Sequence, residues 1–395
     1  MKTLAIQFDL GAKRSRALLT LVFVSTTSLG ILVLGPQTKA AVVGDAGVPK
    51  NTVIATVTVG QNPDSLVISP DSQTVYVANS NPNTVSVIDV AKNYSVEATI
   101  TITNFVNFLA LSLDGKTLYV SEIPPSSDPG VVEVYDVTSP ASPSLTTTLT
   151  AGYYPQCMTV SPDGKELYVA NGERASLRAA EKSATVTGPP PGTVDVFDTE
   201  TNNLIKTIHC NGSPFQVVFT ENGTQVDVLN EAGTGFIQFI DAATEKVSPS
   251  TRAGGLIFRP IGMASNVSAT TLYFPDGLDY VTVCNAKTGA VQKTFLAVSS
   301  VFTAVSFGQP ALTLNGKYLY LPYASGGVLV KTNVSMGPGP GNAVAMIDVG
   351  TGKIIGSLIT VGNNPVWAQV SPDGKTLYVC NNSDGTVSVI DITPK

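Results

Sequence analysis

The eleven residues from Ser161 to Asn171 read Ser-Pro-Asp-Gly-Lys-Glu-Leu-Tyr-Val-Ala-Asn, and this stretch decides the fold. Pro-Asp-Gly favours a tight turn, because proline restricts φ and glycine accepts a positive φ. The residues that follow include the apolar run Leu-Tyr-Val-Ala, and tyrosine and valine are typical of a strand packed between neighbouring sheets. The stretch therefore predicts a hairpin turn followed by a buried strand.

The same turn and strand recur along the chain. Ser-Pro-Asp also begins at Ser69 and Ser371, with variants at Leu113 and Leu314. Weaker copies of the strand alone lie at 226–230 and 272–274, which makes seven copies. Each copy continues into a third strand that ends in an acid or an amide, and these strands are 85–89, 132–136, 194–198, 237–241, 281–285, 344–348 and 387–391. Most copies lie about 43 to 47 residues apart, as expected for propeller blades. We interpret the repeated terminal acids as caps of the next turn and not as catalytic groups.

Each unit then has an outer strand, for example 96–102, 204–210 or 354–361, followed by a Gly-x-x-Pro turn or a variant of it. The chain ends at Lys395 directly after a third strand, whereas residues 52–59 read as an outer strand that precedes the first unit. The sequence thus predicts an all-β fold over residues 52–395, a seven-bladed β-propeller of four-stranded antiparallel blades. We expect the N-terminal strand to complete the last blade, because this removes exposed sheet edges.

The runs Tyr76–Asn79, Tyr168–Asn171 and Tyr378–Asn381 read Tyr-Val-Ala-Asn or Tyr-Val-Cys-Asn. They resemble the repeat of YVTN-family β-propellers, and the likeness extends from about Thr52 to Ile392. The resemblance implies the propeller fold and leaves the function open. Proteins with similar repeats include surface-layer and secreted propellers, lactonase-like propellers and the propeller domain of haem d1 nitrite reductases.

The N-terminal residues are typical of a secretory signal. A basic segment, Lys13–Arg16, precedes the apolar run Ala17–Leu34, and the small-x-small pattern Thr38-Lys39-Ala40 lies before Ala41. The alternative is an uncleaved membrane anchor. We expect residues 1–40 to be removed, residues 41–51 to form a linker, and the protein to be periplasmic or secreted without a membrane span.

Composition excludes several classes of function. A net charge of −6 and a pI near 4.9 leave no basic surface for phosphates, so nucleic acid is not expected as a partner. The single histidine, His209, excludes a site that needs two imidazoles, and the chain has no haem-attachment CxxCH. We therefore expect no cofactor and no metal. The four cysteines show no CxxC spacing and are expected as buried free thiols, with disulfides as the alternative in an oxidising compartment.

Alignment on the Gly-x-x-Pro turn identifies the side chains that begin each inner strand, nearest the propeller axis. Amides and aromatic residues are frequent there and suit a neutral polar ligand such as a sugar or a peptide. The alternative is that they hydrate the mouth of a channel, and Trp367 either plugs this channel or faces a ligand. The candidate ligand-binding residues are Gln61, Asn62, Asn107, Tyr153, Tyr154, Gln156, Gln216, Arg259, Gln309, Asn363, Asn364 and Trp367.

Two insertions, 172–192 and 323–342, fall on second-to-third-strand loops of the third and sixth units. Long loops of this kind are uncommon unless they are functional or disordered. We expect them to rise on opposite sides of one opening, either as binding elements or as solvated decoration. The charged groups that they could bring to the mouth of the propeller are Arg174, Arg178, Glu181, Lys182 and Lys331.

Two functions follow from these patterns. The first is a secreted, monomeric, non-catalytic propeller that presents its loop face to a protein or to a polysaccharide or peptide of the cell envelope. The alternative, implied by the resemblance, is a lactonase-like hydrolase or lyase that acts on a small sugar-derived ring at the axial opening. Lactonase-like propellers use His, Arg and acidic side chains for proton transfer. The candidate catalytic residues here are His209, Arg259 and Asp64, and no motif places them together.

Overall fold

The computed structural model describes residues 47–124, 129–172, 192–230, 236–248, 262–266, 268–275, 280–297, 307–325 and 340–395. All of them belong to one compact unit, Ala46–Lys395. The expected signal segment, Arg259 and most of both insertions lie outside the described residues.

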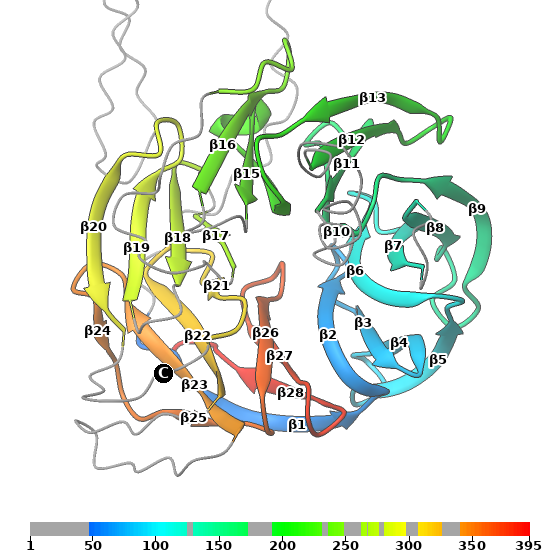
Figure 1. Ribbon diagram of the computed structural model, residues 1–395. Coiled ribbons are helices and arrows are strands. Elements are labelled where there is room, and N and C mark those ends of the chain that lie inside the picture. The colour runs from blue at the N-terminus through cyan, green and yellow to red at the C-terminus, as the bar shows by residue number, and fades with distance from the viewer. Residues whose placement is uncertain are drawn as a thin grey trace, which may run out of the picture. The chain divides into compact units, whose positions relative to one another are not determined.

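Seven antiparallel sheets surround a common axis and form the blades of a β-propeller (Figure 1). Blade 1 consists of β2 (Gln61–Ile68), β3 (Thr74–Asn81), β4 (Asn83–Asp89) and β5 (Ser95–Thr101). Blade 2 consists of β6 (Phe105–Leu111), β7 (Thr117–Ile123), β8 (Val131–Asp136) and β9 (Ser144–Thr150). Blade 3 consists of β10 (Pro155–Val160), β11 (Glu166–Asn171), β12 (Thr193–Asp198) and β13 (Leu204–His209). Blades 4 and 5 consist of β14 (Pro214–Thr220), β15 (Gln225–Asn230) and β16 (Phe236–Asp241); and β17 (Ala264–Ser265), β18 (Thr271–Pro275), β19 (Tyr280–Asn285) and β20 (Val291–Leu296). Blades 6 and 7 consist of β21 (Ala311–Leu312), β22 (Tyr318–Ser325), β23 (Pro340–Asp348), β24 (Lys353–Ile354) and β25 (Ile359–Thr360); and β26 (Pro365–Val370), β27 (Thr376–Asn381), β28 (Thr386–Asp391) and β1 (Thr52–Thr58).

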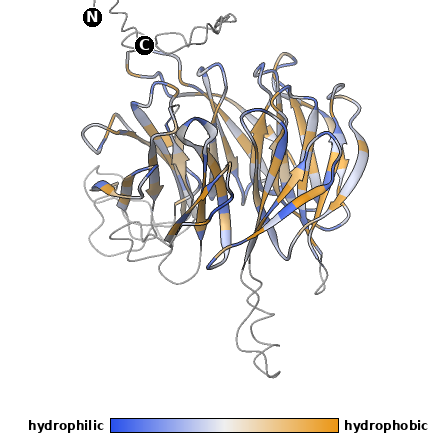
Figure 2. Cartoon of the chain, turned by 90° about the horizontal axis from the view of Figure 1, so that it is seen from above, coloured by the Kyte–Doolittle hydropathy of each residue, from blue (hydrophilic) through white to orange (hydrophobic). Residues whose placement is uncertain are grey.

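The apolar core lies between the blades. Each of seven clusters of buried apolar side chains combines residues of two neighbouring blades, and one of them joins blade 7 to blade 1. The tyrosine of the second strand belongs to the cluster shared with the next blade, so Tyr76 packs on blade 2 and Tyr378 packs on blade 1. This explains why the repeat keeps a tyrosine at that position. Hydrophobic residues lie mostly on the strands, and the turns at the edges are mostly hydrophilic (Figure 2).

The turns are built as the sequence predicts. Ser161 Oγ donates to Asp163 Oδ1 at 2.6 Å, and Gly164 has a φ of 77°. The hydrogen bond from Ser161 lowers the pKa of Asp163. The acid that ends the third strand caps the next turn, as Asp198 Oδ1 does by accepting from the Thr201 amide at 2.6 Å. The interpretation of the repeated acids as structural groups is therefore confirmed.

Three details differ from the expected pattern. Blade 4 has three strands among the described residues, with a single bridge between Ile240 and Val247 on its outer side. The outer strand expected over 354–361 is wrong, because blade 6 has two separate pairs of strand residues there; Gly356, with a φ of 73°, lies in the interruption. The ends of the insertion 323–342 are also strand, since Ser325 pairs with Pro340.

The two ends of the described chain lie side by side. β1 runs antiparallel to β28, with Thr52 opposite Asp391 and Thr58 opposite Thr386. Before β1, the Lys50 amide donates to the Thr393 carbonyl at 2.9 Å. The first strand is thus the outer strand of the sheet that holds the last three.

The four cysteines are free thiols, as expected; three are buried and Cys157 is partly buried. Within the described ranges, no helix has the length and apolar character needed to cross a membrane.

Candidate functional site

We term the side of the propeller at which the inner strands begin the mouth face. It carries the Gly-x-x-Pro turns and the turns from the second to the third strand, which meet where the Val59 amide donates to the Gly385 carbonyl at 2.9 Å. The third residue of three such turns, Asn62, Tyr154 and Asn364, has a φ of 52°, 53° and 54°. Asparagine tolerates this left-handed conformation, whereas a bulky tyrosine there is strained.

A pair of polar side chains lies beneath the mouth-face turn in five blades, one from the second strand and one from the third. We term these the anchor pairs. In four of them the two side chains are hydrogen-bonded, at 3.0 Å for Asn79–Ser86, 2.9 Å for Asn171–Asp195, 3.3 Å for Asn230–Gln238 and 2.9 Å for Asn381–Ser388. The fifth pair, in blade 2, is Glu122 and Glu133.

The glycine of the turn is needed because the turn rests on the anchor pair. A Cβ at Gly60 would lie 2.6 Å from Asn79, and a Cβ at Gly362 would lie 2.7 Å from Asn381. In blades 2 to 4 a side-chain oxygen of the anchor pair also accepts a hydrogen bond from a backbone amide of the turn. The acceptors are Glu122 Oε2 for Asn104 at 2.9 Å, Asp195 Oδ2 for Gly152 at 2.8 Å and Gln238 Oε1 for Asn211 at 3.0 Å.

The anchor pair of blade 2 consists of two acids. Glu122 is fully buried, and Glu133 is 9% exposed. Burial raises the pKa of Glu122 to about 7, and the charge of Glu133 adds to this rise. Tyr135 Oη donates to Glu133 Oε2 at 2.6 Å, and the Asn104 side chain donates to Glu122 Oε2 at 3.0 Å.

Four amides that the sequence assigns to a ligand make contacts between blades. Asn107 Nδ2 donates to the Pro155 carbonyl at 2.8 Å and to Gln156 Oε1 at 3.1 Å. Gln216 and Gln309 both donate to the Met263 carbonyl, at 3.0 and 2.7 Å. These bonds join blades 2 and 3, blades 4 and 5, and blades 5 and 6. The position of the four amides is thus explained by blade packing.

Three aromatic side chains meet across the axis. The ring of Phe108 lies 5.7 Å from that of Trp367 and 6.0 Å from that of Phe215, centroid to centroid. These residues begin the inner strands of blades 2, 7 and 4, which are not neighbours, so their contacts cross the axial space. Each of the three strands has a register shift at its start, and such bulges redirect side chains.

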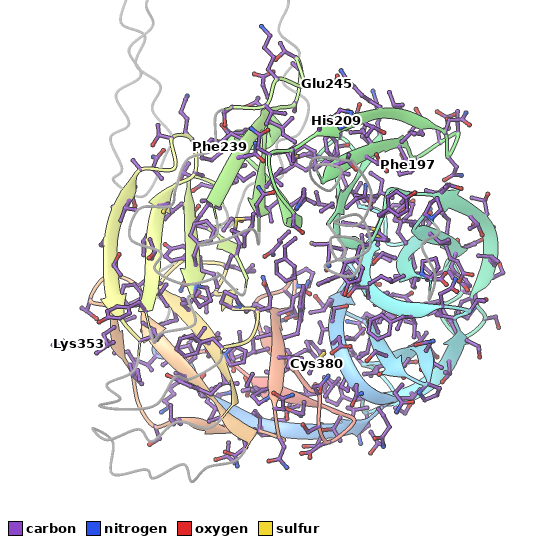
Figure 3. All side chains as sticks on the ribbon, in the orientation of Figure 1. Phe197, His209, Phe239, Glu245, Lys353 and Cys380 are labelled. Atoms are coloured by element: carbon purple, nitrogen blue, oxygen red, sulfur yellow. The ribbon has the colours of Figure 1, made fainter. Side chains whose placement is uncertain are left out.

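Of the three expected catalytic residues, the structure describes Asp64 and His209, which lie on different blades. Asp64 lies on the inner strand of blade 1, where burial raises the pKa of its carboxyl and where Ser80 and Asn382 hydrogen-bond to it. His209 is exposed on β13, the outer strand of blade 3, opposite Thr193 (Figure 3). Arg259 lies outside the described residues.

Two exposed aromatic side chains stand on adjacent turns of the mouth face. Phe105 is 44% exposed in blade 2, and Tyr153 is 43% exposed in blade 3. The two blades are joined here, because the Gly130 amide donates to the Gly152 carbonyl at 2.9 Å. We term Phe105, Tyr153 and Tyr154 the aromatic rim. The sequence alignment missed Phe105, although it stands at the turn position of Asn62 and Tyr154.

The remaining candidates lie on the same face over blades 7 and 1. Asn363 Nδ2 donates to Asp384 Oδ1 at 2.9 Å, and Asn364 Nδ2 donates to Asn382 Oδ1 at 3.2 Å. The Asn62 carbonyl accepts from Ser80, and Gln61 is exposed. The alignment therefore brings these residues to one face, as expected.

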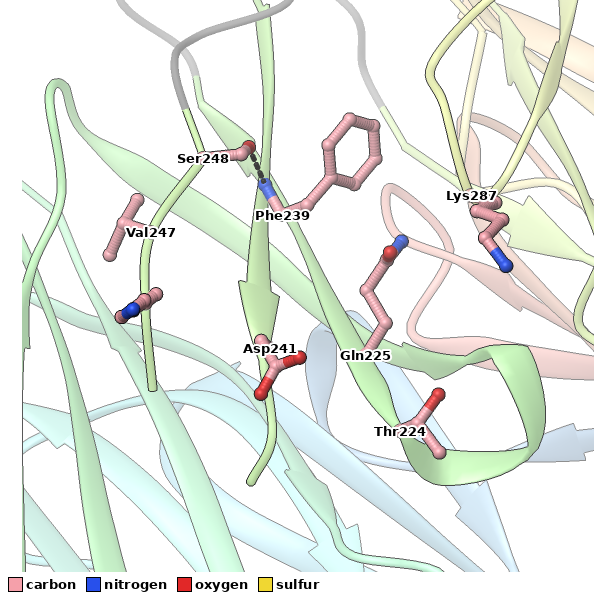
Figure 4. Close-up of a pocket in the computed structure, with 8 residues that line it drawn as sticks. Thr224, Gln225, Phe239, Asp241, Val247, Ser248 and Lys287 are labelled. Carbon is pink, nitrogen blue, oxygen red and sulfur yellow. Dashed lines mark hydrogen bonds between the residues drawn. The ribbon is translucent and has the colours of Figure 1, made fainter. Parts of the chain in front are cut away.

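A hollow of about 450 Å³ lies at the opposite face, beside β16, the outermost described strand of blade 4 (Figure 4). Gln225 crosses from blade 4 to blade 5 by donating to the Ala286 carbonyl at 2.8 Å, and Ser248 Oγ accepts from the Phe239 amide at 3.0 Å. The lining residues are Thr224, Gln225, Phe239, Asp241, Lys246, Val247, Ser248 and Lys287. None of the candidate residues belongs to this hollow.

No protein-family profile matches the chain, and no curated protein matches its sequence. Among solved structures, a chain of the hydrazine synthase of Kuenenia stuttgartiensis is similar, with a TM-score of 0.65 and 19% identity. The match covers 85% of this chain and 97% of that chain. Likeness at this level of identity shows the fold alone, and the resemblance to YVTN-family repeats remains one of motifs.

Proposed function

We propose that the chain is an exported, non-catalytic binding protein whose mouth face takes a carbohydrate chain of the cell envelope. Export is inferred from the sequence of residues 13–41. The observation that carries the binding role is the aromatic rim. Two side chains more than 40% exposed stand on the turns that begin two adjacent blades, next to a tyrosine in the left-handed conformation.

The rim has the chemistry that a carbohydrate needs. Aromatic rings offer apolar faces on which the CH face of a sugar packs, and polar groups beside them orient its hydroxyls. Asn104 adjoins Phe105 in the same turn, and the amides Gln61 and Asn363 lie on neighbouring turns of this face. Strain at a residue such as Tyr154 is found preferentially at functional sites.

The test uses soluble neutral polysaccharides, namely dextran, amylose and mannan, in affinity electrophoresis. We expect Phe105→Ala and Tyr153→Ala each to weaken binding about tenfold, as for aromatic residues that dominate an interface. Leu204→Ala is the matched control, because Leu204 is 50% exposed on the outer strand of blade 3. The proposal fails if no polysaccharide is retarded or if the rim variants bind like the unchanged protein. Retention of a peptide with the same loss in both variants would move the ligand to the peptide class.

One observation favours the hydrolase as a second candidate. Asp64 is a carboxyl with a raised pKa at the start of an inner strand, and such groups occur in acid–base catalysis. Lactone hydrolysis that is abolished by Asp64→Asn and kept in Phe105→Ala would support this function in place of carbohydrate binding.

A further inference from the structure

The anchor pair of blade 2 occupies a position at which other blades form a direct hydrogen bond. Glu122 is equivalent to Asn79, Asn171, Asn230 and Asn381, because each stands three residues after the position of the repeat tyrosine. Four equivalent pairs are in contact at 2.9 to 3.3 Å. In each, the asparagine amide group donates to an oxygen of the third strand.

Two acids at this position can bond to each other only if one of them carries a proton, because an ionised carboxylate has no donor. Oε1 of Glu122 has no hydrogen-bond partner among the described residues, whereas Oε2 accepts twice from Asn104. Glu133 Oε2 accepts from Tyr135. The groups that act on Glu122 are Asn104, from the turn before β6, and Glu133, from β8.

We propose that Glu122 and Glu133 share one proton, and that this proton holds the mouth-face turn of blade 2, with Phe105, in place. The elevated pKa of Glu122, about 7, agrees with this arrangement. When the proton leaves, two like charges face each other in a buried space, where their repulsion is weakly screened. The repulsion is relieved when the carboxyls separate or admit water, and either change disturbs the turn that Asn104 fastens to Glu122.

This inference rests on the proposed function only for its effect on ligand binding. Phe105 follows Asn104 directly, so an alkaline medium would loosen one side of the aromatic rim. The proton is tested without any ligand, by hydrogen exchange of the Asn104 amide, whose N–H bonds to Glu122. Trp367, the only tryptophan, gives a second readout, because its ring lies 5.7 Å from Phe108 on the same strand as Phe105.

The experiment compares the unchanged protein with Glu133→Gln at about pH 5.5 and about pH 8.5, after correction for intrinsic exchange. A glutamine at position 133 carries an amide group that can donate to Glu122 at every pH. Blade 4 also has a glutamine at this position, Gln238, which there accepts from Asn230. We expect protection of Asn104 in the unchanged protein to fall about tenfold between the two conditions. In Glu133→Gln it stays high, and the Trp367 emission no longer changes with pH.

Glu122→Gln is the second variant and is expected to behave like Glu133→Gln, so the test does not depend on one substitution. His209→Gln removes the other kind of side chain that changes charge near neutral pH, and Glu200→Gln removes an exposed acid. Both controls keep the pH dependence of the unchanged protein. The proposal is overturned if that protein shows no pH dependence at Asn104, or if both anchor variants retain it.

A ligand arm separates the two proposals. If dextran, amylose or mannan binds, its affinity falls from about pH 5.5 to about pH 8.5 in the unchanged protein and stays constant in Glu133→Gln. If none binds, the exchange data still decide whether the proton is shared.

Discussion

Blades 1, 2, 3 and 7 differ from blades 4, 5 and 6 in regularity. The first group has four complete strands in each sheet. In the second group, blade 4 has three described strands, the inner strands β17 and β21 have two residues each, and the outer side of blade 6 is split. The apolar clusters between blades nevertheless continue through all seven interfaces. Packing between the sheets, more than the regularity of each sheet, therefore defines the ring.

A polar side chain stands in blade 4 at the position where other blades have the repeat tyrosine. Blade 4 carries Asp227 at the position of the repeat tyrosine, fully buried and bonded to Gln225 at 2.5 Å. Gln225 then reaches blade 5 through the Ala286 carbonyl. Blades 6 and 7 are joined by backbone bonds at the axis, where the Gln309 amide donates to the Val366 carbonyl at 2.8 Å. In blade 4, which lacks the tyrosine, the hydrogen bond of Gln225 thus takes over part of the contact with the next blade.

Removal of β1 tests blade 7, the regular blade in which β1 pairs with β28. We expect deletion of residues 47–58 to lower the free energy of unfolding by at least about 4 kcal/mol, because it exposes β28 as an edge and removes buried Val57. Urea denaturation measures the change. The matched deletion in an irregular blade, Ile355–Leu358 between β24 and β25, is expected to cost far less. Equal losses would show that β1 does not hold the ring closed.

Removal of the repeat tyrosine is expected to give the next largest loss of stability. Tyr76 is fully buried against blade 2, so Tyr76→Ala is expected to cost about 4 kcal/mol through the cavity it leaves. Asp227→Asn, at the equivalent position of blade 4, removes a charge and keeps an acceptor for Gln225, and is expected to cost about 1 kcal/mol. Thermal and urea unfolding of the two variants provide the comparison. A larger loss for Asp227→Asn would mean that the polar substitute holds its interface more firmly than the tyrosine does.

The repeat predicted the fold because its signals are local. The turn from Ser161 to Gly164 and the alternation after it depend on neighbouring residues, so blade number and strand positions can be read directly. The break at Gly356 could not be read this way, since Ile355 and Ile359 keep the apolar character of a strand. Both pair with β23, Ile355 by donating its amide to the Met346 carbonyl at 2.8 Å.

The candidate site was predicted less completely, because the alignment shows on which face of the propeller a residue lies and does not show which groups its side chain contacts. The alignment on Gly-x-x-Pro brings Gln61, Tyr153 and Asn363 to the mouth face. It does not show that Asn107 or Gln309 is engaged by the next blade, since such bonds depend on the angle between sheets. The pairing of Glu122 with Glu133 was present in the repeat register, where Asn79 and Ser86 occupy the same positions. The hydrogen bonds between the equivalent side chains of four other blades are what identify these two acids as a pair.

The smallest expected effect is the pH dependence of the free energy of unfolding that comes from the acidic anchor pair of blade 2. The neutral anchor pair of blade 4 is the comparison. The pKa of Glu122 is raised from 4.5 to about 7 in the folded protein, so the folded state binds the proton more tightly than the unfolded state. The stability contributed by this proton is complete below about pH 4.5 and is lost as pH rises through about 7. The loss is on the order of 3 kcal/mol. Glu133→Gln removes the like charge and supplies a donor to Glu122, whereas the part of the pKa rise that comes from burial remains. The free energy of unfolding of this variant, measured in urea, should therefore decline clearly less over this range than that of the unchanged protein. A parallel decline in both proteins would assign the pH dependence to other groups and would remove the distinction between the two blades.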